Sequence, residues 1–367
     1  MDKLLQLIAH KTEHTQWIPL GDLATIRNGK SYKKLPEGDI PVYGTGGIMT
    51  YVGDYAHPGP SVLIPRKGSL DKLYFVEGPF WTVDTIFYTE IGALLEPKYL
   101  FYYLQFLHLE NLNQAAGIPS LTQTALKKIR IPVPQIPTQQ AIVEVLDKFT
   151  ELEAELEAEL EARTLQYSFY RNFVISGSRT WNFDPTSSPK PWNWEPLQKV
   201  AEPVRSSGKI PKSKYTQTGD YPIIDQGQNY ISGYSDRADL LTGPGEFVLF
   251  GDHTREIKYI NGSFIQGADG LKILSAGEKV LPRYLYFALK TLPIPNLGYS
   301  RHWSTVNNLQ IPVPPREEQE RIVEILDRFD ALVNDISIGL PAEIEARRKQ
   351  YEYYRDKLLT FEEATDE

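Results

Sequence analysis

Cysteine does not occur in this chain of 367 residues, and neither does any long apolar run. The lack of cysteine excludes disulfide bonds, thiolate chemistry and cysteine-ligated zinc fingers. No apolar run approaches the roughly 18 residues that a membrane-spanning helix needs. The short apolar stretch Leu4–Ile8 is followed by no small-residue cleavage site, so it is not typical of a signal peptide. We therefore expect a cytoplasmic protein.

Sequence motifs for catalysis and metal binding are also missing. Gly44–Gly47 is the one stretch that resembles a phosphate loop, but it lacks both the third glycine of a dinucleotide fingerprint and the Gly-Lys-Ser/Thr ending of a P-loop. The six histidines lie far apart in the sequence, and no serine stands in a Gly-x-Ser-x-Gly elbow. The glutamates of Glu151–Glu161 are typical of a solvated helical face rather than of acid-base catalysis. The sequence thus predicts a noncatalytic chain with no metal site and no cofactor of its own.

The net charge of −8 argues at first against a nucleic-acid partner, because phosphate groups repel acidic proteins. The acidic residues are concentrated in two segments, however: residues 138–179 have a net charge of −4 and residues 316–367 one of −7. Residues 1–137 and 180–315 are slightly basic, with net charges of +1 and +2. The chain therefore alternates between two kinds of segment.

An internal repeat divides the chain, whose length already exceeds what one hydrophobic core usually supports. The strongest match is Ile131–Pro134 followed by Ile142–Phe149, which returns as Ile311–Pro314 followed by Ile322–Phe329. Three weaker matches keep the same order at an offset of about 180 residues: Trp17–Ala24 with Trp194–Ala201, Gly38–Val42 with Gly219–Ile223, and Pro97–Leu104 with Pro282–Leu289. The chain is therefore one module present twice.

Each module begins with a part rich in Gly, Pro, Thr, Tyr and Val, in which short apolar runs such as Ser61–Ile64 and Phe247–Phe250 alternate with turn residues. These runs predict strands. An Ile-Pro-Val-Pro segment then supplies an extended lead-in, because a residue before proline avoids the α region, and a long helix follows. The predicted fold class is α+β, with two repeated strand-rich domains, each followed by a long helix. The expected boundaries are 1–137 and 180–315 for the strand-rich domains, and 138–179 and 316–367 for the helices.

Apolar residues in the two long helices recur at nearly heptad spacing, so each helix needs a partner. These positions are Ile142, Val145, Phe149, Leu152, Leu156 and Leu160 in the first helix, and Ile322, Leu326, Phe329, Val333, Ile336 and Leu340 in the second. The glutamate-rich run is also compatible with a solvated single helix, but two matched copies favour mutual pairing as an antiparallel coiled coil. Gly339 and Pro341 interrupt the second helix, where we expect a kink or a break.

This arrangement of a duplicated strand-rich module, an Ile-Pro-Val-Pro lead-in with a glutamine shortly after it, and a coiled-coil helix resembles the specificity (S) subunits of type I restriction-modification systems over nearly the whole chain. One departure is that Glu320 stands at the position of Gln140, with Gln319 one place earlier. The resemblance implies that each strand-rich part is a target recognition domain that reads one half of a split site in double-stranded DNA. It also implies that the spacer helices bind two methyltransferase subunits, with restriction subunits joining the full complex. S-adenosylmethionine and ATP with Mg are expected on those partner subunits, and the specificity subunit itself is noncatalytic.

Physical considerations agree with this resemblance. A rigid helical spacer holds two readers at a fixed separation better than a flexible linker, and an acidic spacer is repelled by phosphate, which leaves DNA contact to the weakly basic domains. Candidate DNA-facing residues are polar or basic side chains in predicted loops. They are Lys30, Ser31, Tyr32, Lys33, Lys34, Arg66, Lys67, Ser120, Thr122 and Gln123 in the first domain, and Arg205, Lys209, Lys212, Lys214, Gln226, Gln228, Asn229, His253, Arg255, Arg301 and His302 in the second.

Two other interpretations stay open at this point. For any single loop, a merely solvated surface accounts for the same residues, and Trp17 and Trp194 lie in apolar frames that favour a core role over base stacking. The net charge of −8 is also compatible with a noncatalytic coiled-coil scaffold that joins two proteins and does not bind DNA. Neighbouring genes for an adenine methyltransferase and a helicase-nuclease would favour the specificity subunit. A DNA-modifying enzyme is disfavoured because the sequence has no cofactor or catalytic motif.

Overall fold

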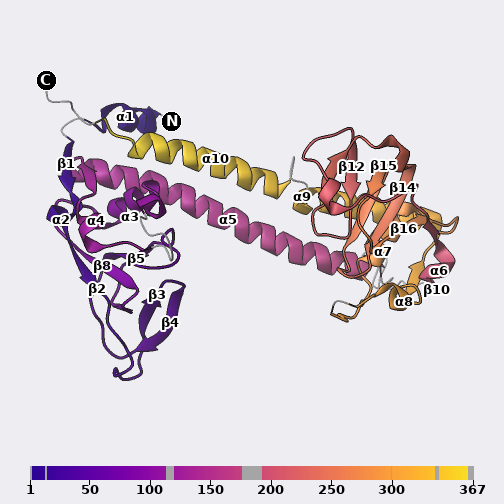
Figure 1. Cartoon of the computed structure of the whole chain (residues 1–367), viewed down its shortest axis with the longest axis horizontal. Helices are drawn as coiled ribbons and strands as arrows, with labels where there is room; N and C mark the ends of the chain where they lie inside the picture. Colours follow the sequence, from indigo (N-terminus) through magenta and orange to yellow (C-terminus); the bar gives the residue numbers. More distant parts are fainter. Residues whose placement is uncertain are drawn as a thin grey trace, which may run out of the picture. The chain divides into compact units, whose positions relative to one another are not determined.

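The computed structural model describes residues 2–12, 15–112, 120–175, 192–298, 300–334 and 339–362. The chain forms two compact units, the first from Met1–Glu157 together with Ile344–Glu367 and the second from Ala158–Glu343. Each unit contains one strand-rich domain and part of the long helices (Figure 1). The fold class predicted from the sequence is confirmed: two repeated strand-rich domains are each followed by long helix.

Two small sheets form the body of the first unit. One is antiparallel with the order β2-β8-β5-β6, and the other has the order β4-β3-β7, in which β3 and β7 run parallel. The strands are β2 (Ala24–Asn28), β3 (Ile40–Gly44), β4 (Gly47–Val52), β5 (Ser61–Pro65), β6 (Tyr74–Val76), β7 (Trp81–Thr82) and β8 (Ile86–Ile91). Every residue of β5 is buried, as its continuous apolar sequence predicts.

Short helices cover the core of the first unit. They are α1 (Asp2–His10), α2 (Leu20–Leu23), α3 (Pro97–Phe106), η1 (Leu109–Leu112) and α4 (Gln123–Lys127). The first turn of α3 is set by Glu96, whose carboxylate accepts a hydrogen bond from the Tyr99 N–H at 2.6 Å, and by Pro97, which lacks an N–H that would need a partner. Tyr99, which is fully buried, donates its hydroxyl to the carbonyl of Pro132 at 2.9 Å. This contact ties α3 to the strand that leads into the long helix.

One six-stranded sheet forms the body of the second unit, in the order β11-β16-β14-β15-β12-β13. Its strands are β11 (Ala201–Val204), β12 (Tyr221–Ile224), β13 (Gly233–Ser235), β14 (Leu241–Gly251), β15 (Ile257–Gln266) and β16 (Leu271–Ala276). The helices beside it are α6 (Leu197–Val200), η2 (Lys212–Lys214), η3 (Ala238–Leu240), α7 (Pro282–Leu289) and α8 (Trp303–Val306). As in the first unit, a fully buried tyrosine of the covering helix, Tyr284 of α7, bonds a proline carbonyl of the lead-in strand, that of Pro312 at 2.9 Å.

Both long helices begin from the same two-stranded lead-in. In the first unit β1 (Gln16–Pro19) pairs antiparallel with β9 (Arg130–Val133), and in the second β10 (Asn193–Pro196) pairs with β17 (Gln310–Val313) in the equivalent register. The core role expected for the two tryptophans holds in one unit only. Trp17 packs against the core of the first unit, whereas Trp194 exposes 50% of its surface, so that expectation was wrong for Trp194.

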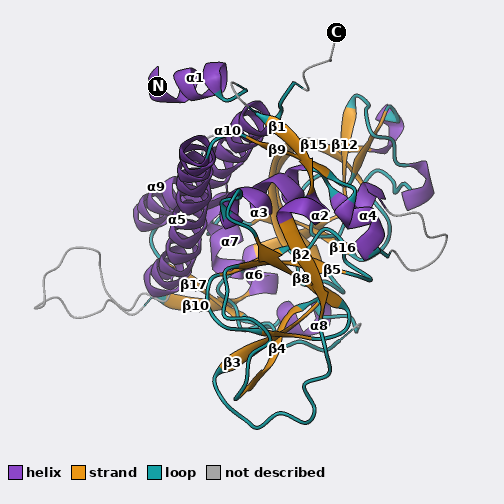
Figure 2. Ribbon diagram, turned by 90° about the vertical axis from the view of Figure 1, so that its left-hand side faces the viewer, coloured by secondary structure: helices purple, strands orange, loops and turns teal. Residues whose placement is uncertain are grey.

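The long helices pack against each other within each unit. The first, α5 (Ile136–Ile175), is continuous, and its N-terminal part packs in the first unit against α10 (Leu340–Leu359), as Figures 1 and 2 show. The Phe149 ring stacks on Tyr354 with centroids 5.6 Å apart. One helical turn on, Arg348 pairs with Glu153 at 2.6 Å and also with Glu157. As the numbers rise along α5 they fall along α10, so the two helices are antiparallel.

The C-terminal part of α5 packs in the second unit against α9 (Arg316–Asn334). The Tyr167 hydroxyl bonds Asp330 at 3.1 Å, and the Tyr167 and Tyr170 rings both stack on Phe329. Most of the apolar positions expected to pack are buried or half-buried, but Leu152 exposes 45% of its surface. Fully buried positions concentrate toward the ends of α5, and the acidic middle remains solvated.

The expected interruption of the second helix is present as two separate helices. The first of them, α9, ends at Asn334, and α10 begins at Leu340, directly after Gly339. Ile336, expected to pack in the spacer, lies outside the described residues. Gly339 and Pro341 disfavour a continuous helix, which explains why α9 and α10 are separate helices.

The glutamine after each lead-in corrects the alignment made from the sequence. Gln139 and Gln319, and not Gln140, are the equivalent residues, and both are fully buried. The Gln139 amide donates to the carbonyls of Leu94 at 3.0 Å and Pro134 at 2.8 Å, and its oxygen accepts from the Glu96 N–H at 2.8 Å. Gln319 makes the same three bonds in the second unit. The apparent replacement of glutamine by Glu320 is therefore no departure from the repeat, because residue 320 lies on the exposed face.

Candidate DNA interface

The lysine loop of the first domain is anchored at its base and exposed at its tip. The Lys30 N–H donates to the carbonyl of Thr82 at 2.8 Å, and the Lys30 carbonyl accepts from the Trp81 indole at 2.8 Å, so β7 holds the start of the loop. Lys33 and Lys34 are exposed, whereas Tyr32 is half-buried. The two lysine charges are therefore available to a phosphate backbone.

The structure brings together two predicted segments of the first domain that are distant in sequence. Lys67 forms an antiparallel bridge with Ser120, and the Leu121 N–H donates to the Arg66 carbonyl at 2.9 Å. The Arg66 side chain is exposed, with its guanidinium 5.7 Å from the centre of the Phe87 ring. Thr122 is used locally, because its hydroxyl caps α4 by accepting from the Ala125 N–H at 3.1 Å, and half-buried Gln123 begins that helix.

The basic residues of the second domain differ in whether an acidic side chain pairs with them. Lys212 and Lys214 are exposed on η2, and Arg205 and Arg301 are exposed as well. Lys209 is paired with Asp269 at 2.7 Å, and this hydrogen bond holds the pKa of Asp269 below its ordinary value. Because both partners of the pair are solvent-exposed, it competes only weakly with a phosphate.

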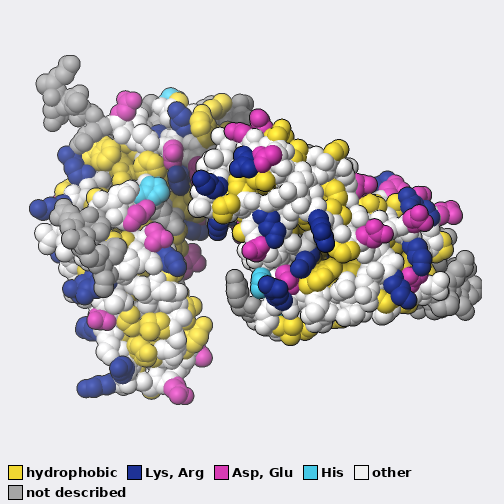
Figure 3. All heavy atoms as spheres, turned by 45° about the vertical axis from the view of Figure 1, so that its right-hand side comes forward, with side chains coloured by type: hydrophobic (Ala, Val, Ile, Leu, Met, Phe, Trp, Pro, Cys, Tyr) yellow, Lys and Arg dark blue, Asp and Glu magenta, His cyan; other side chains and the backbone are white. Residues whose placement is uncertain are grey.

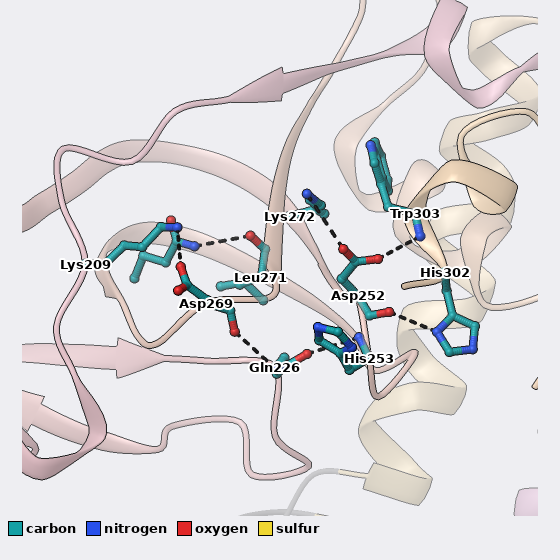
Figure 4. Close-up of polar contacts among 10 residues, drawn as sticks. Lys209, Gln226, Asp252, His253, Asp269, Leu271, Lys272, His302 and Trp303 are labelled. Atoms are coloured by element: carbon teal, nitrogen blue, oxygen red, sulfur yellow. Dashed lines mark hydrogen bonds and ion pairs between the residues drawn. The ribbon is translucent and has the colours of Figure 1, made fainter. Parts of the chain in front are cut away.

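The Gln226 amide makes two hydrogen bonds within the domain, and its role as a base reader stays a prediction. Its amide oxygen accepts from the His253 N–H at 3.1 Å and its amide nitrogen donates to the Asp269 carbonyl at 3.1 Å (Figure 4). Both ends of the amide thus hold neighbouring turns together. Gln228 and Asn229 are exposed, so their side-chain amides are accessible to DNA.

The prediction that His302 faces DNA was wrong, because its side chain is fully buried. One ring nitrogen, Nε2, accepts from the Leu297 N–H at 3.1 Å. The other, Nδ1, lies 2.9 Å from the Asp252 carbonyl (Figure 4). Because Nε2 accepts a hydrogen bond, Nδ1 is the ring nitrogen that donates. His302 therefore ties the start of α8 to the end of β14.

The two domains share one backbone contact, but the residue that accepts it is basic in the first domain, Arg66, and acidic in the second, Asp252. The His302 N–H donates to the Asp252 carbonyl at 2.9 Å, which matches the bond from Leu121 to Arg66 in the first domain. The buried Asp252 carboxylate accepts from the Trp303 N–H at 2.7 Å and so caps α8, with Lys272 3.8 Å away. The exposed arginine of one domain thus corresponds to a buried structural aspartate in the other.

Sequence reasoning missed Lys258, which supports the exposed Gln228 and Asn229. This lysine is 5% exposed and donates to the carbonyls of Asp225 at 2.8 Å and Asn229 at 2.6 Å. Burial lowers the pKa of Lys258, and the charge of Asp225 opposes this effect. No sequence signal distinguishes it from a surface lysine, because its partners are backbone carbonyls of a distant turn.

Exposed apolar residues on equivalent hairpins of the two domains were also missed. Ile48, Met49 and Tyr51 of β4 each expose half or more of their surface, and Tyr230 and Ile231 before β13 expose 52% and 37%. Their positions next to turn residues are compatible with contact to thymine methyl groups. Basic side chains, by contrast, are scattered among acidic and uncharged ones on the face shown in Figure 3, and form no dense patch there.

A family model described as the type I restriction modification DNA specificity domain matches residues 13–162 and again residues 189–346. The chain belongs to this family. The specificity subunit of the Escherichia coli EcoR124I/EcoR124II type I restriction enzymes is 31% identical over 72% of this chain and 70% of its own length. A Haemophilus influenzae protein, named as type I restriction enzyme specificity subunit S.HindORF215P, is 30% identical over 98% of both chains.

Solved structures agree on the fold of this specificity subunit. The S subunit of a type I restriction-modification system from M. genitalium matches with a TM-score of 0.63 at 16% identity, covering 96% of this chain and 98% of its own. A chain from a structural study of complex assembly in a type I system matches with a TM-score of 0.59 at 17% identity, over 94% and 97% of the two chains. The family is noncatalytic, so membership assigns this chain to DNA recognition rather than to catalysis.

The described residues contain no helix long and apolar enough to cross a membrane. In the same part of the chain, no group of three or more histidine, aspartate or glutamate side chains is arranged to hold a metal ion.

Proposed function

We propose that the two strand-rich domains each read one half of a bipartite site in double-stranded DNA. The observation that carries this proposal is the duplication of a complete reader: each domain has its own apolar core, its own covering helix, and the same lead-in strand pair. Two similar readers with different loops suit a target whose halves differ in sequence.

The DNA-contacting surface in this proposal consists of the exposed loop residues of both domains. Lys33, Lys34, Arg66 and Lys67 in the first domain, and Lys212 and Lys214 in the second, bind phosphates and give affinity without sequence preference. Gln228 and Asn229 have the side-chain type that pairs with adenine edges, and they are exposed beside the Gln226 turn. Gln226 and His302 support this surface from behind.

The long helices in this proposal are the docking surface for two methyltransferase subunits, because the repeat presents two equivalent helical surfaces. Restriction subunits join in the full complex. S-adenosylmethionine, ATP and Mg then belong to those partners, and this chain contributes no residue to their chemistry. The chain then acts in the cytoplasm, where it meets the DNA.

Exchange of one domain tests the division of labour. Residues 190–305 are replaced by the matching domain of a relative with a different target, and the methylome of a host that carries the complex is sequenced. We expect one half of the methylated motif to change and the other half to stay. The reciprocal exchange of the first domain is the matched control and should change the opposite half. Changes in both halves after a single exchange would show that the domains do not read independently.

A further inference from the structure

A pocket of about 420 Å³ in the second unit is lined by basic side chains from three separate elements. Arg171 comes from the last turns of α5, Arg255 from the turn between β14 and β15, and Lys290 from the end of α7. Glu256 is the one carboxylate among the described residues of the wall, so the lining has an excess of two positive charges. Such a pocket favours an anionic ligand.

The basic groups of this pocket are poorly neutralised by the protein. Arg171 lies over the Tyr167 ring, 5.4 Å from its centre, and its Nε is buried without a hydrogen-bond partner in the described structure. Lys290 lies 4.6 Å from the centre of the Tyr286 ring. Burial is the largest cause of a lowered pKa at Lys290; Asp330 opposes it, and the charges of Arg171 and Arg283 add to it. An acceptor with negative charge would satisfy both groups.

The internal repeat supplies a comparison for these residues. Arg171 corresponds to Arg355, which lies over Tyr351 in the same way, 5.8 Å from the ring centre. Arg355 is neutralised by the next residue, Asp356, at 2.8 Å. In the second unit the equivalent position is Asn172, which has no charge.

The same comparison holds on the covering helix. Lys290 directly follows the matched segment Pro282–Leu289, and the residue that follows Pro97–Leu104 is the uncharged Gln105. At these two pairs of positions the second unit lacks one negative charge and gains one positive charge. A third pair adds a negative charge, because Asp330 stands where the first unit has Thr150, but Arg283 pairs with Asp330 at 3.0 Å. The pocket lining itself therefore keeps its excess of positive charge.

We infer that this basic pocket, formed by Arg171, Arg255 and Lys290, binds an oxyanion, and that its ligand in the working complex is a backbone phosphate of DNA. Two arginine forks and one ammonium group match the several oxygens of a phosphate better than they match the single charge of a protein carboxylate. Arg255, which lines the pocket, is one of the residues that the sequence predicts to face DNA. The inference rests on the proposed function, since DNA supplies the phosphate.

Two variants introduce into the second unit the residues that stand at the equivalent positions of the first unit. Lys290→Gln installs the residue of position 105, and Asn172→Asp installs the carboxylate that neutralises the arginine in the other repeat. Binding of the assembled complex to a non-specific DNA duplex is measured from low to moderate salt. We expect Lys290→Gln to lower the slope of log affinity against log salt by about 0.9, the value for one lost phosphate contact, and Asn172→Asp to weaken binding without removing a basic residue. Lys279→Gln before α7, which removes an exposed lysine paired with Glu195, is the matched control and should leave the slope unchanged.

The other outcomes overturn the inference in distinguishable ways. If both variants are folded and keep the wild-type slope, the pocket is no DNA contact. If sodium phosphate raises the Tm of the wild type more than sodium chloride of equal ionic strength, and Lys290→Gln abolishes this difference without changing the slope, the ligand is free phosphate. If the variants instead lose affinity for the methyltransferase subunit while the slope is kept, the ligand is an acidic protein group. A wild-type complex that does not bind DNA at all would refute the proposed function itself.

Discussion

Lengthening α5 by one turn should widen the gap between the two halves of the recognised DNA site. The helix has 40 residues from Ile136 to Ile175, and therefore spans about 60 Å at about 1.5 Å per residue. Four added residues extend it by about 6 Å, which corresponds to roughly two base pairs at about 3.4 Å per pair. Because four residues are close to one turn of about 3.6, the apolar face is nearly kept in register.

The structure indicates where this insertion does least harm. Leu-Glu-Ala-Glu is placed directly after Glu157, where the two compact units meet along the sequence. The ion pairs of Arg348 with Glu153 and Glu157 then stay within the first unit. The contacts of Tyr167 with α9 stay within the second. A second variant adds four residues also between α9 and α10, so that both connections between the units become longer by the same number of residues.

Methylome sequencing of a host that expresses each variant with its partner subunits is the assay. The expected motif has unchanged half-sites and a gap longer by about two base pairs. A variant that is folded and methylates DNA with the original gap would refute the reasoning, because the helix would then not measure the distance. Its role as a docking surface would be all that remained of the spacer.

Three further predictions concern single sites. Replacing Lys33 and Lys34 by Ala should weaken binding to all DNA sequences and lower the salt slope by about 0.9 for each lost phosphate contact, which binding titrations at several salt concentrations will measure. Gln139→Ala should lower the free energy of unfolding by about 2 to 4 kcal/mol, because one buried and two partly buried backbone groups lose their partner, and Gln319→Ala should cost the same in urea denaturation of the full chain. Burial, with the charge of Lys357 second, lowers the pKa of Lys11 to about 8, so its protonated form opposes folding. Stability relative to Lys11→Met should therefore rise as the pH increases from 8 towards 10.5, and a flat difference across that range would contradict the burial of this amine.

The repeat made the architecture predictable from the sequence. Proline at alternating positions in Ile131–Pro134 and Ile311–Pro314 restricts the backbone to extended conformations, and these segments are the strands β9 and β17. Both long helices begin directly after them. The interruption near Gly339 was predictable for a similar reason, since glycine and proline act locally on the backbone.

The side-chain surface was less predictable, because distant contacts decide which polar groups are free. Gln226 and His302 have side chains suited to DNA, but turns that are remote in sequence occupy them. Residue type alone does not reveal such partners. The equivalence of Gln139 and Gln319, by contrast, could have been found, because Gln139 stands three residues before Ile142 and therefore on the buried face of the helix.

Whether this chain selects the DNA target is decided by comparing adenine methylation in the source genome with and without this gene. Deletion should remove methylation from one bipartite motif, and reintroducing the gene should restore that motif while other methylated motifs stay the same. An unchanged methylome in a strain whose methyltransferase partner is expressed and active would contradict the claim that this chain selects the DNA target.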